Sequence, residues 1–179
     1  MIETANYIMR EVSEALEKVD PALVDTIVTS LIDAETVFVY GVGRSGLVGK
    51  AFAVRLVQMG LDVHFVGDTT TPIVEEKDLV FIISNTGETM SAVQTANIVR
   101  RIGAKVITIT SNPHSKLAVA SNHIIEIPPC RDEQRKRLAP LGTVFEAAAF
   151  IMLDSMVPLL MTRLGQNESS LRQRHAIWV

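Results

Sequence analysis

The chain has 179 residues, 47% hydrophobic and 21% charged, so it can bury a full core and is too apolar to be disordered. The formal charge of −3 excludes a general attraction to nucleic acid or anionic membranes, and the single cysteine, Cys130, excludes an internal disulfide. The longest apolar stretch, 147–161, contains Asp154 and Pro158 and is too short to span a bilayer. Because residues 1–20 contain no signal-peptide core, we expect a cytoplasmic protein.

Two helices are predicted at the start of the chain. Apolar residues recur at helical spacing from Ile8 to Val19, which is typical of an amphipathic helix. Asp20 and Pro21 then form a pattern typical of an N-cap followed by proline at the first helical position.

Short apolar runs rich in Val, Ile or Phe alternate with helical segments through the rest of the chain, which favours a parallel sheet covered on both faces. The predicted strands are 36–40, 62–66, 79–84, 105–110 and 123–127, and the predicted helices are 45–59, 89–102, 115–121, 143–164 and 167–175. We expect one α/β domain over 1–179, a three-layer α/β/α sandwich. Its parts are N-terminal helices (1–34), a sheet core (35–127), and a closing helix with a tail (140–179). The charged stretch 131–137 is interpreted as a solvated loop.

The first candidate binding loop, GVGRSG at 41–46, follows the first strand and begins a helix. Glycines let the backbone approach a ligand closely, and the start of a helix offers unpaired N–H groups to an anion. The motif also matches G-x-G-x-x-G, and Asp68 lies near the end of the second strand, so a dinucleotide site is an alternative.

The second candidate loop, SNTGET at 84–89, follows the third strand and favours a single phosphate ester over a dinucleotide. Its hydroxyls and amide suit the several short hydrogen bonds that phosphate oxygens accept. With a flavodoxin-type strand order of 2-1-3-4-5, both loops flank the switch point where ligands bind. The predicted phosphate-binding residues are Gly43, Arg44, Ser45, Ser84, Asn85, Thr86, Gly87 and Thr89. The alternative is that these residues only cap helices, with Thr89 as an N-cap.

These two loops, with Thr110–Pro113 after the fourth strand, resemble the SIS (sugar isomerase) domain family. Within it the chain is similar to the 6-phospho-3-hexuloisomerases over nearly its whole length, on the segments 37–50, 51–60, 66–72, 140–146 and 174–176. Two features depart from the usual pattern: the second loop is SNTGET rather than SGSGET, and the chain ends in AIWV rather than an acidic tail.

The resemblance implies an isomerase that interconverts D-arabino-hex-3-ulose 6-phosphate and fructose 6-phosphate without a metal or cofactor. It also implies a place in formaldehyde assimilation by the ribulose monophosphate pathway, or in pentose supply. The mean hydropathy of +0.26 is high for a small soluble chain and suggests a subunit interface, so we expect a homo-oligomer, a tetramer or a dimer.

Moving the carbonyl between C3 and C2 through an enediol needs a base, and Glu146 is the first candidate. It lies at the start of the closing helix, where a negative charge is also favourable on its own account. Glu88 is the rival carboxylate, although its negative charge in the second loop would oppose phosphate binding unless the side chain points away. His175 is the second catalytic candidate and could come from a neighbouring subunit.

Two other functions stay open at this point. One is a related isomerase of the same fold that acts on arabinose 5-phosphate or sedoheptulose 7-phosphate. The other is a non-catalytic regulator that binds a sugar phosphate.

Overall fold

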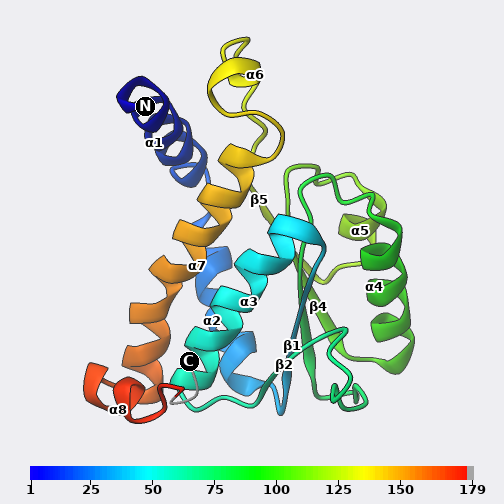
Figure 1. Cartoon of the computed structure of the whole chain (residues 1–179). Coiled ribbons are helices and arrows are strands. Elements are labelled where there is room, and N and C mark those ends of the chain that lie inside the picture. The colour runs from blue at the N-terminus through cyan, green and yellow to red at the C-terminus, as the bar shows by residue number, and fades with distance from the viewer. Residues whose placement is uncertain (177–179) are drawn as a thin grey trace.

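The structure is a computed structural model that describes residues 1–176 (Figure 1). Its centre is a five-stranded parallel sheet with the strand order β2-β1-β3-β4-β5, as predicted. The strands are β1 (Val37–Gly41), β2 (Val63–Phe65), β3 (Leu79–Ile83), β4 (Lys105–Thr110) and β5 (His123–Glu126). The chain reverses direction across the sheet between β1 and β3, so the loops after these two strands lie at the switch point.

Helices cover both faces of the sheet and confirm the three-layer sandwich. In Figure 1, α4 and α5 lie on one side of the sheet, and α1, α2, α3 and α7 lie on the other. The helices are α1 (Ile2–Leu16), α2 (Pro21–Asp33), α3 (Gly43–Gln58), α4 (Met90–Ile102), α5 (Lys116–Val119), α6 (Arg135–Leu138), α7 (Thr143–Leu164) and α8 (Glu168–Gln173).

Alternation along the strands divides the core into two parts. Val37 and Val39 of β1 pack into the larger cluster with α1, α2, α3 and α7. Phe38, between them, points to the smaller cluster with α4 and α5. Both faces of the central strands are therefore buried, which explains their continuous apolar sequence.

The long helix α7 belongs to the larger core. By length and composition it could cross a membrane. It packs instead against α1, α2 and α3, and its side chains Phe145, Ala149 and Leu160 are buried in the cluster they share. The buried face of this 22-residue helix is thus apolar because it is a core element.

Two local predictions differ from the structure. The stretch interpreted as a loop contains the short helix α6, which begins where Asp132 Oδ1 accepts a hydrogen bond from the Gln134 amide at 2.9 Å. Leu138 and Ala139, at its end, are buried in the core. The edge strand β2 is shorter than predicted because Gly67, with φ +108°, turns the chain soon after Phe65.

Candidate active site at the switch point

The first loop brings the start of α3 unusually close to β1. A Cβ at Gly46 would lie 2.4 Å from the carbonyl oxygen of Gly41, and one at Gly49 would lie 2.9 Å from Val39 Cγ1. Gly43 has φ +59° and space for a Cβ among the described residues. Glycine is therefore favoured here by the backbone conformation and not by a close contact. The glycines therefore let the first turn of α3 lie directly over the end of the strand.

The second loop is held by hydrogen bonds from the last residue of β4 and the residue that follows it. The backbone oxygen of Asn85 accepts hydrogen bonds from Ser111 Oγ at 2.7 Å and from Thr110 Oγ1 at 3.1 Å. Gly87 has φ +65°, and a Cβ there would lie 2.0 Å from the Oγ of the buried Ser115. These contacts give the loop a defined shape.

Both loops line one cavity of about 160 Å³, which we call the loop cavity. Its lining residues are Val42, Ser45, Ile83, Ser84, Asn85, Thr86, Thr89 and Ala92. The predicted hydroxyls of Ser45, Ser84, Thr86 and Thr89 are thus brought together, although they come from two loops about 40 residues apart. Ser45 and Ser84 are buried, and Ser84 Oγ lies 3.4 Å from Thr89 Oγ1.

The hydroxyls around this cavity do not cap the two helices. No side chain in the described range 1–176 caps the N-terminus of α3, which begins after Val42, or that of α4, which begins after Thr89. The first N–H groups of a helix need partners, and together with the helix dipole they attract an anion. The cavity therefore combines two open helix N-termini with a set of hydroxyl donors.

Glu146, in the first turn of α7, does not line this cavity but contacts the first loop, and α7 begins next to the second. Its Oε2 accepts a hydrogen bond from Arg44 Nε in the first loop. A Cβ at Gly142 would lie 3.1 Å from Asn85 Nδ2 and 3.4 Å from Glu146 Oε1, so the glycine lets α7 begin close to the second loop. Most of the Glu146 side chain is buried, whereas that of Arg44 is largely exposed.

Glu88, the rival carboxylate, is bound to α5. Its Oε1 accepts a hydrogen bond from the Lys116 amide at 3.1 Å, and its Oε2 lies 3.3 Å from Lys116 Nζ. These two contacts, the amide first, hold the pKa of Glu88 below its ordinary value. Neither Glu88 nor Glu146 lines the loop cavity. Glu88 is held toward α5 by Lys116, whereas Glu146 is paired with Arg44 of the first loop.

His175 lies far from the loop cavity of its own chain. The neighbouring Arg174 donates a hydrogen bond to the carbonyl oxygen of Gln58, at the C-terminal end of α3. The cavity is at the opposite end of this 16-residue helix, about 24 Å away along its axis. Within one chain, His175 and Glu146 are not brought together.

Three features of the site were not found from the sequence. The ion pair between Arg44 and Glu146 joins residues about 100 positions apart, and no local pattern signals it. Ser115, beneath Gly87, has the pattern of an ordinary helix N-cap, a role it also fills by accepting from the Ala118 amide. Gly142 follows Leu141 in a turn whose tight approach to Asn85 depends on tertiary packing.

Comparisons with known proteins identify the family of the chain. The SIS domain family model matches residues 30–152. A 3-hexulose-6-phosphate isomerase of Methanocaldococcus jannaschii is 36% identical over 151 residues, which cover 84% of this chain and 81% of that protein. A 3-hexulose-6-phosphate isomerase of Bacillus subtilis is 31% identical over 182 residues, which cover 98% of both.

A solved structure has the same fold over its full length. It is a hypothetical protein of Methanococcus jannaschii, whose crystal structure was described as inferring a molecular function of 3-hexulose-6-phosphate isomerase. It is 30% identical to this chain, with a TM-score of 0.89 and 99% of each chain covered. The chain therefore belongs to the SIS domain family and groups with the sugar-phosphate isomerases of that family.

Proposed function

We propose that this protein interconverts D-arabino-hex-3-ulose 6-phosphate and fructose 6-phosphate, with the phosphate bound in the loop cavity. The observation that carries the proposal is that the open N-termini of α3 and α4 and the hydroxyls of both loops line the same cavity. A phosphate dianion can accept hydrogen bonds from several such donors at once. The resemblance to the relatives named 3-hexulose-6-phosphate isomerase supports the choice of sugar.

Glu146 is the proposed general base. It removes the proton from C2 of the 3-ulose, and the released electron pair forms the C2=C3 bond of an enediolate. The proton held by Glu146 then returns to C3 as the C2 carbonyl forms, and the O2 proton passes to O3, which yields fructose 6-phosphate. No electrons leave the substrate, so the step needs neither oxidant nor reductant. Arg44 holds the carboxylate beside the cavity.

We propose that the active assembly is a homo-oligomer, a dimer or a tetramer. Helices α3 and α7 pack against each other, and each carries exposed apolar side chains: Leu47 and Val54 on α3, and Phe150 and Ile151 on α7. Exposed apolar groups on adjoining helices favour contact with a second copy. In such an assembly His175 of a neighbouring subunit would approach Glu146 and move protons between O2 and O3.

The cytoplasm is the proposed location. The free Cys130 thiol donates a hydrogen bond to Glu11 Oε2 at 2.9 Å, an arrangement that needs the thiol to stay reduced. Reducing conditions of that kind prevail in the cytoplasm.

Conversion of Glu146 to Gln tests the proposed base. We expect Glu146→Gln to lower kcat at least about a hundredfold while KM changes only a few-fold, because the amide keeps the shape and loses the basic oxygen. Fructose 6-phosphate formed from the 3-hexulose substrate is measured directly. Glu168→Gln, on the exposed face of α8, is the matched control and keeps wild-type turnover.

Three results would contradict the proposal. Undiminished turnover in Glu146→Gln would remove Glu146 as the base. Conversion of arabinose 5-phosphate or sedoheptulose 7-phosphate, with no fructose 6-phosphate formed from the 3-hexulose, would assign a different substrate. Binding of fructose 6-phosphate by a wild-type chain that turns over none of these sugars would indicate a regulator.

A further inference from the structure

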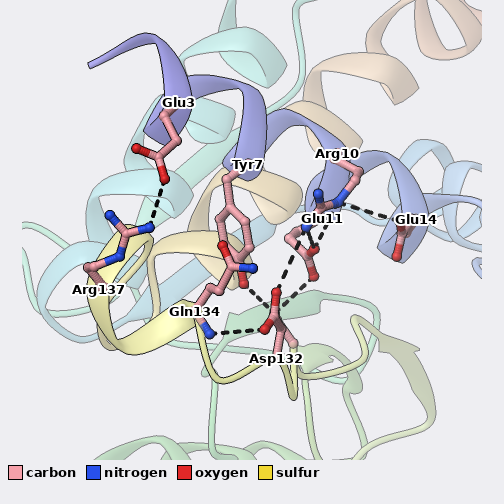
Figure 2. A network of polar contacts seen from close by, with 9 residues as sticks. Glu3, Tyr7, Arg10, Glu11, Glu14, Asp132, Gln134 and Arg137 are labelled. Atoms are coloured by element: carbon pink, nitrogen blue, oxygen red, sulfur yellow. Dashed lines mark hydrogen bonds and ion pairs between the residues drawn. The ribbon is translucent and has the colours of Figure 1, made fainter.

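The segment that leads into α7 is tied to the N-terminal helix. We call residues 130–142 the strap. Cys130 Sγ, at its start, lies 3.2 Å from Tyr7 Oη and donates to Glu11 Oε2 at 2.9 Å. Further along, Arg137 Nη2 donates to Glu3 Oε1 at 2.7 Å, and Figure 2 shows this pair beside α1. The strap is therefore held against α1 at both its start and its middle.

The strap ends in a strained turn. Leu141 has φ +56° and is the one non-glycine residue with a positive φ in the described range 1–176. The residue is 89% exposed, so apolar packing does not compensate for this conformation. Non-glycine residues persist in this region only when surrounding contacts hold them there.

Polar contacts hold the turn in place. Arg135 Nη1, from α6 of the strap, donates a hydrogen bond to the carbonyl oxygen of Leu141 at 3.0 Å. On the other side, Thr143 Oγ1 donates to the carbonyl oxygen of Pro140 at 2.6 Å. Arg135 is the one long side chain among these contacts, and it bonds to the strained residue six positions further along the chain.

The turn determines where the active-site helix begins. Gly142 follows Leu141 directly, and its carbonyl oxygen accepts the Glu146 amide at 2.8 Å, which places Glu146 in the first turn of α7. Gly142 also lies against Asn85 Nδ2 and Glu146 Oε1. A rotation of the Leu141 peptide would therefore move Glu146 relative to the loop cavity.

We propose that Arg135 is a positioning residue for the isomerisation: by holding the Leu141 carbonyl it fixes the strained turn that sets Glu146 beside the loop cavity. The proposal rests on the function of Glu146 as the base. Arg135 acts through the turn, and the residues that line the loop cavity do not belong to the strap.

Substitution of Arg135, read as separate effects on kcat and KM, tests the proposal. We expect Arg135→Ala to lower kcat about tenfold while KM for the 3-hexulose phosphate stays within about twofold, because the base is misplaced and the phosphate site is intact. Arg135→Lys keeps a donor and recovers part of kcat. Lys136→Ala is the matched control: Lys136 is the next residue in α6, its Nζ lies 3.5 Å from the exposed carboxylate of Glu133, and the variant keeps wild-type values.

A second variant covers the case in which Arg135→Ala unfolds the strap. In the Arg135→Ala background, Leu141→Gly removes the backbone strain, and we expect it to recover folding and part of kcat. Wild-type kcat in Arg135→Ala, equal changes in kcat and KM, or no recovery with Arg135→Lys would overturn the positioning role alone. A wild-type chain that forms no fructose 6-phosphate would overturn the proposed function and this role with it.

Discussion

Gly87 shows how a single residue shapes the loop cavity. It combines φ +65° with a close approach to the buried Ser115, whose Oγ lies 2.0 Å from the position of a Cβ. The sequence motif predicted a glycine with backbone freedom at this place. It could not predict the contact with Ser115, because that residue lies 28 positions further along and belongs to another loop.

Alanine at Gly87 is expected to damage both stability and binding. We expect Gly87→Ala to lower the free energy of unfolding by about 2 kcal/mol, since it adds a clash to an unfavourable φ. The KM for the sugar phosphate rises about tenfold or more as the second loop shifts. Urea unfolding and steady-state kinetics measure the two effects.

Gly165→Ala is the matched control for this change. Gly165 has nearly the same φ, +63°, and among residues 1–176 no neighbouring atom lies within 4 Å of an added Cβ. Its substitution should cost about 1 kcal/mol and leave KM unchanged. If the two variants lost the same stability and kept the same KM, the contact with Ser115 would have no part in shaping the site.

The secondary-structure elements and their order were largely predictable from local pattern. Apolar runs and helix signals located β4 and α7 with the observed limits, and Asp20 caps α2 by accepting the Ala22 amide at 2.9 Å, as predicted. The helix α6 was not predictable, because its four residues carry no apolar period and its buried end depends on contact with the rest of the chain. The apolar pattern of a sequence indicates which face of a regular element is buried, whereas the conformation of a short irregular segment depends on its packing against the rest of the chain.

Contact between α1 and the strap makes stability depend on pH. The Cys130 thiol, which donates to its carboxylate, and then the Arg10 guanidinium hold the pKa of Glu11 below its ordinary value of 4.5. A lowered folded-state pKa contributes stability that is fully present above the ordinary value and is lost as pH falls through the folded value.

We therefore expect Glu11→Gln to lower the free energy of unfolding by about 1–2 kcal/mol at pH 7, with the difference from wild type shrinking below pH 4.5. Urea unfolding at a series of pH values measures the difference. Glu14→Gln, at an exposed carboxylate 3.8 Å from Arg10, is the control and changes stability little. A wild-type advantage that stayed constant down to pH 3 would contradict this account of Glu11.

At the scale of the whole molecule, the strand order explains why distant loops meet. In a parallel sheet ordered β2-β1-β3-β4-β5, the carboxyl ends of β1 and β3 are neighbours, so their loops share a cavity. This meeting of the loops was predictable once the order was assumed. The sequence raised a neighbouring subunit as the source of His175, but the packing of the tail against the end of α3 was not predictable, because it has no local signal.

Mixing two inactive variants tests whether His175 acts from a neighbouring subunit. We expect Glu146→Gln and His175→Ala to be nearly inactive alone. Co-refolded, they should recover up to about a quarter of wild-type activity, because mixed oligomers contain sites with both wild-type residues. Activity is measured after size-exclusion chromatography confirms mixed assembly. Mixed oligomers without recovered activity, or full activity of His175→Ala alone, would contradict the shared site.

The central claim is that the loops after β1 and β3 bind one phosphate ester next to Glu146. A crystal structure with bound fructose 6-phosphate tests it most directly. We predict phosphate oxygens within hydrogen-bond distance of the hydroxyls of Ser45, Ser84, Thr86 and Thr89, with C2 and C3 facing a Glu146 carboxylate. A phosphate bound away from these hydroxyls, or held by one loop alone, would contradict the claim.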